Sequence, residues 1–214
     1  DQFCLYYEIL IEFGRKTNLT SIEGGKNVAV KHFLDSLTFY KAIQIKSDSS
    51  VIDIGTGAGF PGVPLKIKEP SLTLTLLESS RKRVAFLRFL ISKLALTNTE
   101  IAVGRAESLG KIHEYRENYD LTIARGVAEL SVLAELCLPF TKLGGAFVAF
   151  KGPGIHYELK SAAKAVELMG GSFENMKHIK LPWGYGDRYI VIIRKEMPTP
   201  KKYPRRPGIP GKRP

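Results

Sequence analysis

The stretch Asp53-Ile-Gly-Thr-Gly-Ala-Gly-Phe-Pro-Gly62 constrains the fold more than any other part of the sequence. It directly follows a short apolar run at residues 50–54 and precedes residues 62–68, which suit a helix. Glycines let the backbone turn sharply and approach a ligand without a Cβ in the way. A glycine-rich turn between a buried strand and a helix indicates an α/β fold that binds a nucleotide-type ligand at the carboxyl edge of its strands.

Apolar runs and helical periodicity alternate along the rest of the chain. Strands are predicted at residues 50–54, 72–77, 100–103, 121–124, 145–150, 173–181 and 188–194. Helices are predicted at residues 3–13, 28–43, 62–68, 81–96, 130–138 and 156–169, with a loop at 18–22 and a helical turn around Glu107. The first five strands favour a doubly wound, mostly parallel sheet, and the last two favour an antiparallel hairpin at one edge.

These elements divide the chain into three parts. We expect an N-terminal helical extension at residues 1–49, one α/β domain at 50–195 and a basic, proline-rich tail at 196–214. The tail holds six lysines and arginines against Glu196 alone, together with six of the twelve prolines. Such a composition cannot bury a core, so we expect an extended tail.

The formal net charge of +11 indicates a polyanionic partner, nucleic acid above all, although a merely solubilising terminus is the alternative for the tail. The chain has only two cysteines and four scattered histidines, from which we expect a reducing, cytoplasmic location and no metal. No apolar run is long enough to span a bilayer, so we expect no membrane association. The first residue is Asp1 rather than Met, and we expect further residues before it.

The ligand of the glycine turn is ambiguous from its pattern alone. Gly57, Gly59 and Gly62 fit G-x-G-x-x-G, and Glu78 follows Gly57 by 21 residues, as in dinucleotide-binding enzymes. A small dehydrogenase is therefore one hypothesis.

Three features argue against that hypothesis. Asp53 places a carboxylate just before the glycines, and Pro61 and Pro64 lie where a pyrophosphate needs free N–H donors. The chain also has no second domain to hold a hydride acceptor. An adenosine cofactor without phosphates, S-adenosyl-L-methionine, suits the turn better.

Three further strand ends carry candidate ligand contacts. Glu78 ends the second strand, where a carboxylate can accept hydrogen bonds from ribose hydroxyls, and Ser79 beside it can share this role. Gly104-Arg-Ala-Glu107 follows the third strand and can surround an adenine. Arg125 ends the fourth strand, where the sulfonium and the substrate should meet.

Six stretches occur in one order and are specific in combination: Asn18-Leu-Thr-Ser21, His32-Phe-Leu-Asp-Ser36, the glycine turn, Lys82-Arg-Val-Ala-Phe-Leu87, Ala124-Arg125 and Asp187-Arg188. Together they resemble the bacterial ribosomal RNA small subunit methyltransferase G family, also called glucose-inhibited division protein B. The resemblance covers residues 3–213. It implies a seven-stranded, Rossmann-like class I methyltransferase that methylates guanine N7 in 16S ribosomal RNA and converts S-adenosyl-L-methionine into S-adenosyl-L-homocysteine.

The resemblance also implies site residues. The cofactor contacts that it transfers by motif are Gly55, Phe60, Ala106, Glu107 and Arg125. The glycine pattern adds Gly57, and strand position adds Glu78 with its neighbour Ser79. The candidates for holding the base and its phosphates are His32, Asp35, Arg125, Lys151 and Arg188. No general base is expected, because guanine N7 has a lone pair and needs alignment rather than deprotonation.

Each of these assignments has an alternative in which the residue has no role in binding. His32 and Asp35 can simply pair with each other, and Lys151 and Arg188 can be solvated strand-end charges. The run Arg81-Lys-Arg83 predicts phosphate contacts or a solvated helix end. Trp183 and Tyr185 alternate with glycines in a polar loop, so either ring can stack on an RNA base. The alternative is that Trp183 packs against the sheet.

Two alternatives remain for the function as a whole. One is a class I methyltransferase that acts on a small molecule or a protein, and the other is a non-catalytic RNA-binding module on the same scaffold. Nothing in the sequence indicates an obligate interface, so we expect a monomer.

Overall fold

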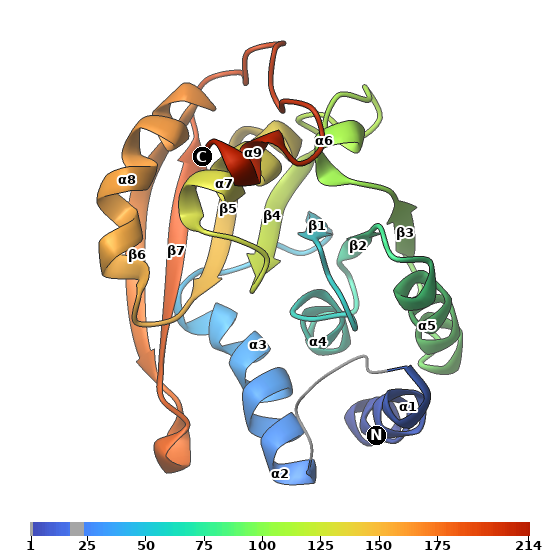
Figure 1. The fold of residues 1–214 in the computed structure, drawn as a ribbon. Helices are drawn as coiled ribbons and strands as arrows, with labels where there is room; N and C mark the ends of the chain where they lie inside the picture. Colours follow the sequence, from blue (N-terminus) through green and yellow to red (C-terminus); the bar gives the residue numbers. More distant parts are fainter. Residues whose placement is uncertain (1, 18–23) are drawn as a thin grey trace.

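The computed structural model describes residues 2–17 and 24–214. Its centre is a seven-stranded sheet with strand order β3-β2-β1-β4-β5-β7-β6 (Figure 1). The strands are β1 Ser50–Ile54, β2 Thr73–Glu78, β3 Thr99–Val103, β4 Tyr119–Arg125, β5 Thr141–Lys151, β6 Gly171–Lys180 and β7 Asp187–Lys195. Strands β1 to β5 pair in parallel, whereas β7 is antiparallel to both β5 and β6. The predicted sheet with its antiparallel hairpin at one edge is therefore confirmed.

Helices cover both faces of the sheet, because side chains alternate along each strand. In β1, Val51 packs with α1, α4 and α5 on one face, while Ile52 and Ile54 pack with α6, α7 and α8 on the other. The bounds of these helices are α1 Gln2–Thr17, α4 Gly62–Lys68, α5 Arg81–Lys93, α6 Ala106–Leu109, α7 Leu130–Cys137 and α8 Ile155–Leu168. A short 3₁₀ turn, η3 Leu138–Phe140, follows α7 at Pro139.

The N-terminal extension differs in detail from its prediction. Helix α1 continues through Gly14 to Thr17, and the predicted loop at 18–22 lies outside the described residues. The second predicted helix is a continuous helical run: α2 Gly25–Val28, η1 Ala29–Leu34, α3 Asp35–Leu37 and η2 Thr38–Lys41. Its η1 part is a π-helix, a form that is often found at functional sites.

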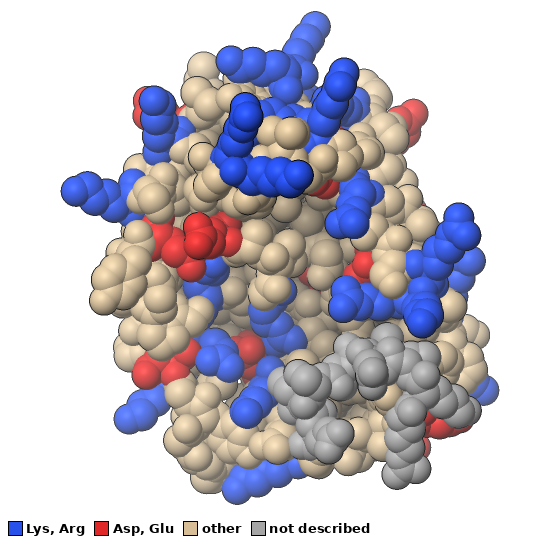
Figure 2. Space-filling view, in the orientation of Figure 1, with Lys and Arg blue, Asp and Glu red and all other residues tan. Residues whose placement is uncertain are grey.

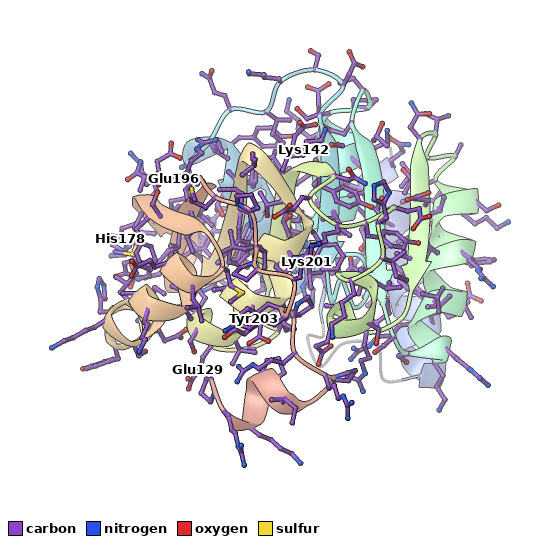
Figure 3. The ribbon with its side chains drawn as sticks, turned by 90° about the horizontal axis from the view of Figure 1, so that it is seen from above. Glu129, Lys142, His178, Glu196, Lys201 and Tyr203 are labelled. Carbon is purple, nitrogen blue, oxygen red and sulfur yellow. The ribbon has the colours of Figure 1, made fainter. Side chains whose placement is uncertain are left out.

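The C-terminal segment, residues 196–214, folds back onto the body of the protein. Thr199, Pro204 and Pro210 are buried, and helix α9 Ile209–Lys212 packs against α7. Figure 3 follows the segment from Glu196 past Lys201 and Tyr203 to α9. The expectation of an extended tail is wrong, because its prolines and backbone find partners on the α6–α7 side of the sheet.

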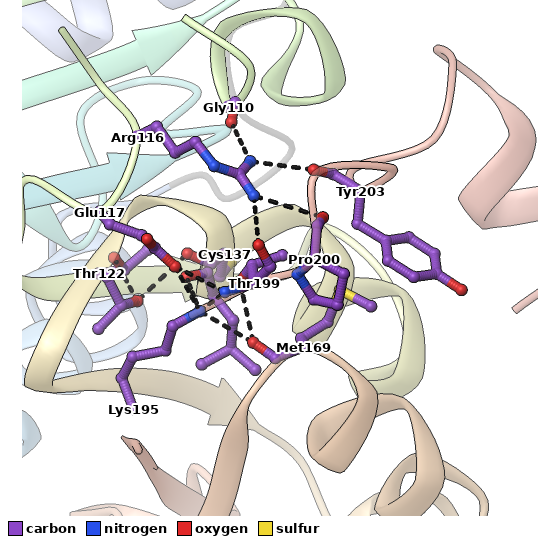
Figure 4. A network of polar contacts seen from close by, with 12 residues as sticks. Gly110, Arg116, Glu117, Thr122, Cys137, Met169, Lys195, Thr199, Pro200 and Tyr203 are labelled. Atoms are coloured by element: carbon purple, nitrogen blue, oxygen red, sulfur yellow. Dashed lines mark hydrogen bonds and ion pairs between the residues drawn. The ribbon is translucent and has the colours of Figure 1, made fainter. Parts of the chain in front are cut away.

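Three charged contacts hold this segment in place, and none of them is visible as a local sequence pattern. Arg205 forms an ion pair with the buried Glu135 (Nη2 to Oε2, 2.6 Å). The Gly208 N–H donates to Glu107 Oε1 at 2.9 Å. The Arg116 guanidinium donates to the backbone carbonyls of Gly110, Thr199, Pro200 and Tyr203 (Figure 4).

Lys195 closes the same network from the end of β7. Its buried ammonium lies 3.2 Å from Glu117 Oε1, donates to Thr199 Oγ1, and also donates to the carbonyls of Leu138 and Met169. Burial lowers the pKa of Lys195 to about 8, although the Glu117 carboxylate opposes the shift.

Within the described ranges, no helix is long and apolar enough to cross a membrane.

Candidate functional site

The glycine-rich turn after β1 has a backbone that favours glycine. Gly55 and Gly57 have φ values of 67° and 63°. A Cβ at Gly55 would lie 2.9 Å from Val127 Cγ2, so a side chain there collides with the loop that follows β4. A Cβ at Gly57 would meet no atom closer than 4.0 Å. The turn is therefore closed on one side and open for a ligand on the other.

The backbone N–H groups of this turn are largely used inside the protein. Gly57 donates to Glu78 Oε2 at 3.1 Å, and Gly62 donates to Asp53 Oδ2 at 2.9 Å. Two further N–H groups of the turn donate to a carbonyl within it. A pyrophosphate needs free N–H donors and is repelled by two carboxylates. The turn thus suits a phosphate-free adenosine that carries a cationic sulfonium, and it does not suit a dinucleotide.

Glu78 lies at the end of β2, beside the turn. Its side chain is only 4% exposed, and its carboxylate accepts three backbone N–H groups, from Gly57, Ser79 and Ser80. A carboxylate has about four lone-pair sites, so one remains free for a hydroxyl. A contact to both ribose hydroxyls requires one of these three bonds to open.

The predicted adenine contacts follow β3. Ala106 is buried at the start of α6, and Glu107 accepts the N–H of Gly208. The C-terminal segment therefore lies directly against this part of the candidate cofactor site. The sequence did not suggest this contact, since the two residues are about a hundred positions apart.

Arg125, at the end of β4, is the centre of a polar cluster with the π-helical run. Its side chain is 15% exposed, and its Nη1 lies 3.1 Å from Asp35 Oδ2 and 3.2 Å from Ser36 Oγ. Its Nη2 lies 3.2 Å from His32 Nδ1. Its guanidinium also covers the ring of Phe60, at 5.2 Å from the centroid. Three segments of the chain thus meet at one cation: the end of β4, the π-helical run and the glycine turn.

Phe60 joins the glycine turn to this cluster. Its buried ring stacks on His32 (centroids 4.4 Å apart) and on Tyr6 (5.1 Å). Tyr6 in turn donates a hydrogen bond from its hydroxyl to the Ala58 carbonyl within the turn. Tyr6 was not singled out from the sequence, since its spacing in α1 is that of any core residue. Phe60 is accordingly part of a buried ring stack beneath the site.

Four of the five residues predicted to hold the substrate lie together, and one does not. Asp35 lies between Arg125 and Arg188, whose Nε is 2.8 Å from Asp35 Oδ1. Lys151 is held apart by an ion pair with Glu158 at 2.6 Å and by a hydrogen bond to the Ala128 carbonyl. The sequence did not point to Glu158, which lies on the first turn of α8.

The electrostatics of the cluster keep His32 neutral at ordinary pH. Burial, followed by the positive charges of Arg125 and Lys31, lowers the pKa of His32 to about 4. Burial raises the pKa of Asp35, but Arg125 and Arg188 oppose that shift. The cluster is therefore a pair of cations around one carboxylate with a neutral imidazole beside it.

In the described part of the chain, no three His, Cys, Asp or Glu side chains gather as a metal site requires.

Asp53 supplies a pH-dependent prediction at this site. Burial raises the pKa of Asp53 to about 6 from 3.8, although Thr56 and Gly62 donate hydrogen bonds to it. The folded state then binds more protons than the unfolded state between pH 3.8 and 6, so this group's contribution to stability falls as pH rises through that window. Relative to Asp53→Asn, the wild-type free energy of unfolding should fall by roughly 2.4 kcal/mol between pH 4 and pH 7. Urea unfolding of both proteins measures this difference, and parallel pH profiles would contradict it.

The matching family model is described as rRNA small subunit methyltransferase G, and it covers residues 1–190. A curated relative, Ribosomal RNA small subunit methyltransferase G from Pelotomaculum thermopropionicum, is 50% identical over 213 residues. The match spans 100% of this chain and 89% of the relative.

Solved structures share the fold at low sequence identity. A SAM dependent methyltransferase from Aquifex aeolicus is 17% identical with a TM-score of 0.59, covering 83% of this chain and 97% of its own. M. jannaschii TYW2 in complex with AdoMet is 17% identical with a TM-score of 0.54, covering 69% of this chain and 68% of its own. These two likenesses concern the fold alone.

Proposed function

The chain belongs to the ribosomal RNA small subunit methyltransferase G family, and we propose that it transfers a methyl group from S-adenosyl-L-methionine to N7 of a guanine in small-subunit ribosomal RNA. The observation that carries this proposal is the glycine turn with two carboxylates on one side and the Arg125 cluster on the other. The turn can bind an adenosine that carries no phosphate, and the cations of the cluster can bind a negatively charged substrate.

The cofactor supplies an activated methyl group when it is bound. Gly55, Gly57 and Glu78 would hold its adenosine, with Ser79 and Ala106 beside them. Arg125 and Arg188, fixed by Asp35, would orient the guanine and its phosphates. Because N7 attacks through its own lone pair, alignment is the task of these side chains, and no residue has to accept a proton.

The substrate is proposed to be 16S ribosomal RNA, free or within the small subunit. The net charge of +11 supports a polyanionic partner. Figure 2 shows Lys and Arg side chains gathered along the upper rim, where Figure 1 places the C-terminal segment. Arg81, Lys82 and Arg83 are exposed at the start of α5 and add further positive charge. We propose that the protein does this work as a monomer in the cytoplasm.

The test is methyl transfer from radiolabelled S-adenosyl-L-methionine to small subunits that lack the native modification. The RNA is digested, and the labelled nucleoside is identified. Label in 7-methylguanosine is the expected result. Intact cofactor binding without any label would overturn the RNA substrate and favour a small-molecule or protein methyltransferase. RNA binding without cofactor binding would favour a non-catalytic module.

The C-terminal cations give a second prediction. The exposed ones are Lys201, Lys202, Arg206, Lys212 and Arg213. Replacing them with serine leaves the buried contacts of Thr199 and Arg205 in place, whereas deleting residues 197–214 would remove those contacts as well. We expect weaker RNA binding and a shallower salt dependence, by roughly 0.7 to 0.9 units of logarithmic slope per lost phosphate contact.

The control for this variant replaces the exposed Lys160 and Lys164 on α8 with serine. Binding of a ribosomal RNA fragment is measured across a series of salt concentrations. If the C-terminal variant and the α8 control give the wild-type slope, the C-terminal cations contribute only to solubility.

A further inference from the structure

The loop between β6 and β7 presents an aromatic side chain to solvent in an unusual way. Trp183, in the turn η4 Pro182–Gly184, is 70% exposed, so it does not pack against the sheet. Its backbone has φ 54° and ψ 31°, a left-handed conformation that is uncommon for a bulky residue. Such conformations cost about 1–3 kcal/mol and cluster at functional segments, including ligand clamps. The chain therefore holds this indole outward at an energetic cost.

Cations and a second ring surround the indole. Lys26 Nζ lies 5.4 Å from the centroid of Trp183, and Lys31 Nζ lies 5.7 Å from that of Tyr185. The Tyr185 hydroxyl donates a 2.9 Å hydrogen bond to Asn27 Oδ1, which ties the loop to α2. With Gly184 and Gly186, the two lysines and two rings line an open depression of about 490 Å³. We call this set of six residues the Trp183 platform.

Two residues of the Trp183 platform are close in the sequence to residues of the Arg125 cluster. Lys31 directly precedes His32, which contacts Arg125. Tyr185 is three residues before Arg188, which forms an ion pair with Asp35. Strand β6 runs parallel to β5, so the loop that follows it emerges at the same edge of the sheet as the glycine turn.

We propose that the Trp183 platform binds a single-stranded nucleotide of the RNA substrate that neighbours the guanine to be methylated. This proposal rests on the proposed function. Proteins bind unpaired RNA bases by stacking them on exposed aromatic rings, with lysines or arginines along the phosphates. The platform combines both kinds of group, whereas an acidic peptide would need only the lysines. Asp187, the carboxylate that follows the loop, contacts His178 (Oδ1 to Nε2, 2.7 Å) and is not among the residues that line the platform.

Because Trp183 is the only tryptophan in the chain, its fluorescence reports directly on the platform. The probe is a short single-stranded oligoribonucleotide, titrated in the absence of cofactor. We expect it to quench the fluorescence, and we expect polyglutamate and inorganic polyphosphate to have little effect. Equal quenching by all three would mean that the site responds to charge alone, and polyglutamate as the strongest binder would indicate an acidic protein partner. Either result overturns the proposal.

Substitutions give the second measurement. Stacking of one base on an aromatic ring contributes about 1–3 kcal/mol of binding free energy, so Trp183→Ala should weaken oligonucleotide binding by about tenfold. Fluorescence anisotropy of a labelled probe measures the affinity. Trp183→Phe should retain most of the affinity. The matched control is Tyr157→Ala, because Tyr157 is 89% exposed on α8 and does not line the platform. Cofactor binding should be unchanged in all three variants.

Methylation kinetics separate this inference from the function on which it rests. With small subunits as substrate, Trp183→Ala should raise KM for the subunit with little change in kcat. Suppose that the wild type methylates the subunit and that Trp183→Ala keeps the wild-type KM and oligonucleotide affinity. Then the platform does not bind the RNA, and the proposed methyltransferase function is unaffected. If the wild type fails to methylate RNA at all, the function fails, and the fluorescence titration still decides whether the loop binds unpaired bases.

Discussion

Replacing Gly55 with valine should lower the affinity for S-adenosyl-L-methionine by roughly 5- to 150-fold. The backbone at Gly55 has φ 67°, and a Cβ there would lie 2.9 Å from Val127 Cγ2. A branched side chain must therefore displace either the loop after β4 or the turn itself, and both border the proposed adenosine site. Overpacking of this kind costs about 1–3 kcal/mol, and 1.4 kcal/mol corresponds to a tenfold change in affinity. Calorimetric titration with S-adenosyl-L-homocysteine measures the loss.

A control separates the collision from backbone strain. Gly144 also has a positive φ, 76°, but a Cβ there would meet no atom within 4 Å. Gly144→Val imposes the same conformational penalty at the amino end of β5, away from the turn. It should lower thermal stability and leave cofactor affinity unchanged. Wild-type affinity in a folded Gly55→Val protein would show that the cofactor does not use this turn.

The glycine turn illustrates what a sequence can predict well. Its strand, its glycines and its helix are neighbours in the chain, so local patterns determine them. The same holds for β1 to β5 and for the long helices, whose ends differ by a few residues from their predictions.

The features that the sequence missed all depend on partners far away in the chain. The C-terminal segment reads as an unpacked tail, because nothing near it in the sequence shows that Glu135, Glu107 and Arg116 will bind it. The π-helical turn and the ring stack of Tyr6 on Phe60 likewise arise only from packing between segments. Polar clusters that join distant segments are thus the part of a site that local patterns leave open.

Removing Arg125 is expected to have the second large effect. Arg125→Met keeps an unbranched side chain over Phe60 but leaves the 4% exposed Asp35 with Arg188 alone. Loss of one partner from a buried ion pair costs roughly 3 kcal/mol of folding stability. Misplacement of reacting groups by about 1 Å is enough to lower activity about 100-fold, so we expect at least that loss in kcat/KM for the small subunit.

A double-mutant cycle tests whether the two effects share a cause. In Arg125→Met the buried Asp35 carboxylate has lost one of the cations around it, so adding Asp35→Asn removes the cost of burying that carboxylate and leaves the more exposed Arg188 to solvent. The double variant should therefore recover part of the stability lost in the single variant but none of the methylation activity. Arg88→Met, at an exposed position on α5, controls for the loss of one positive charge and should leave both quantities unchanged. If activity returns together with stability in the double variant, Arg125 acts only through folding. If activity instead stays below that of the Asp35→Asn single variant, Arg125 positions the substrate, since a folded cluster without its guanidinium then still fails to align the guanine.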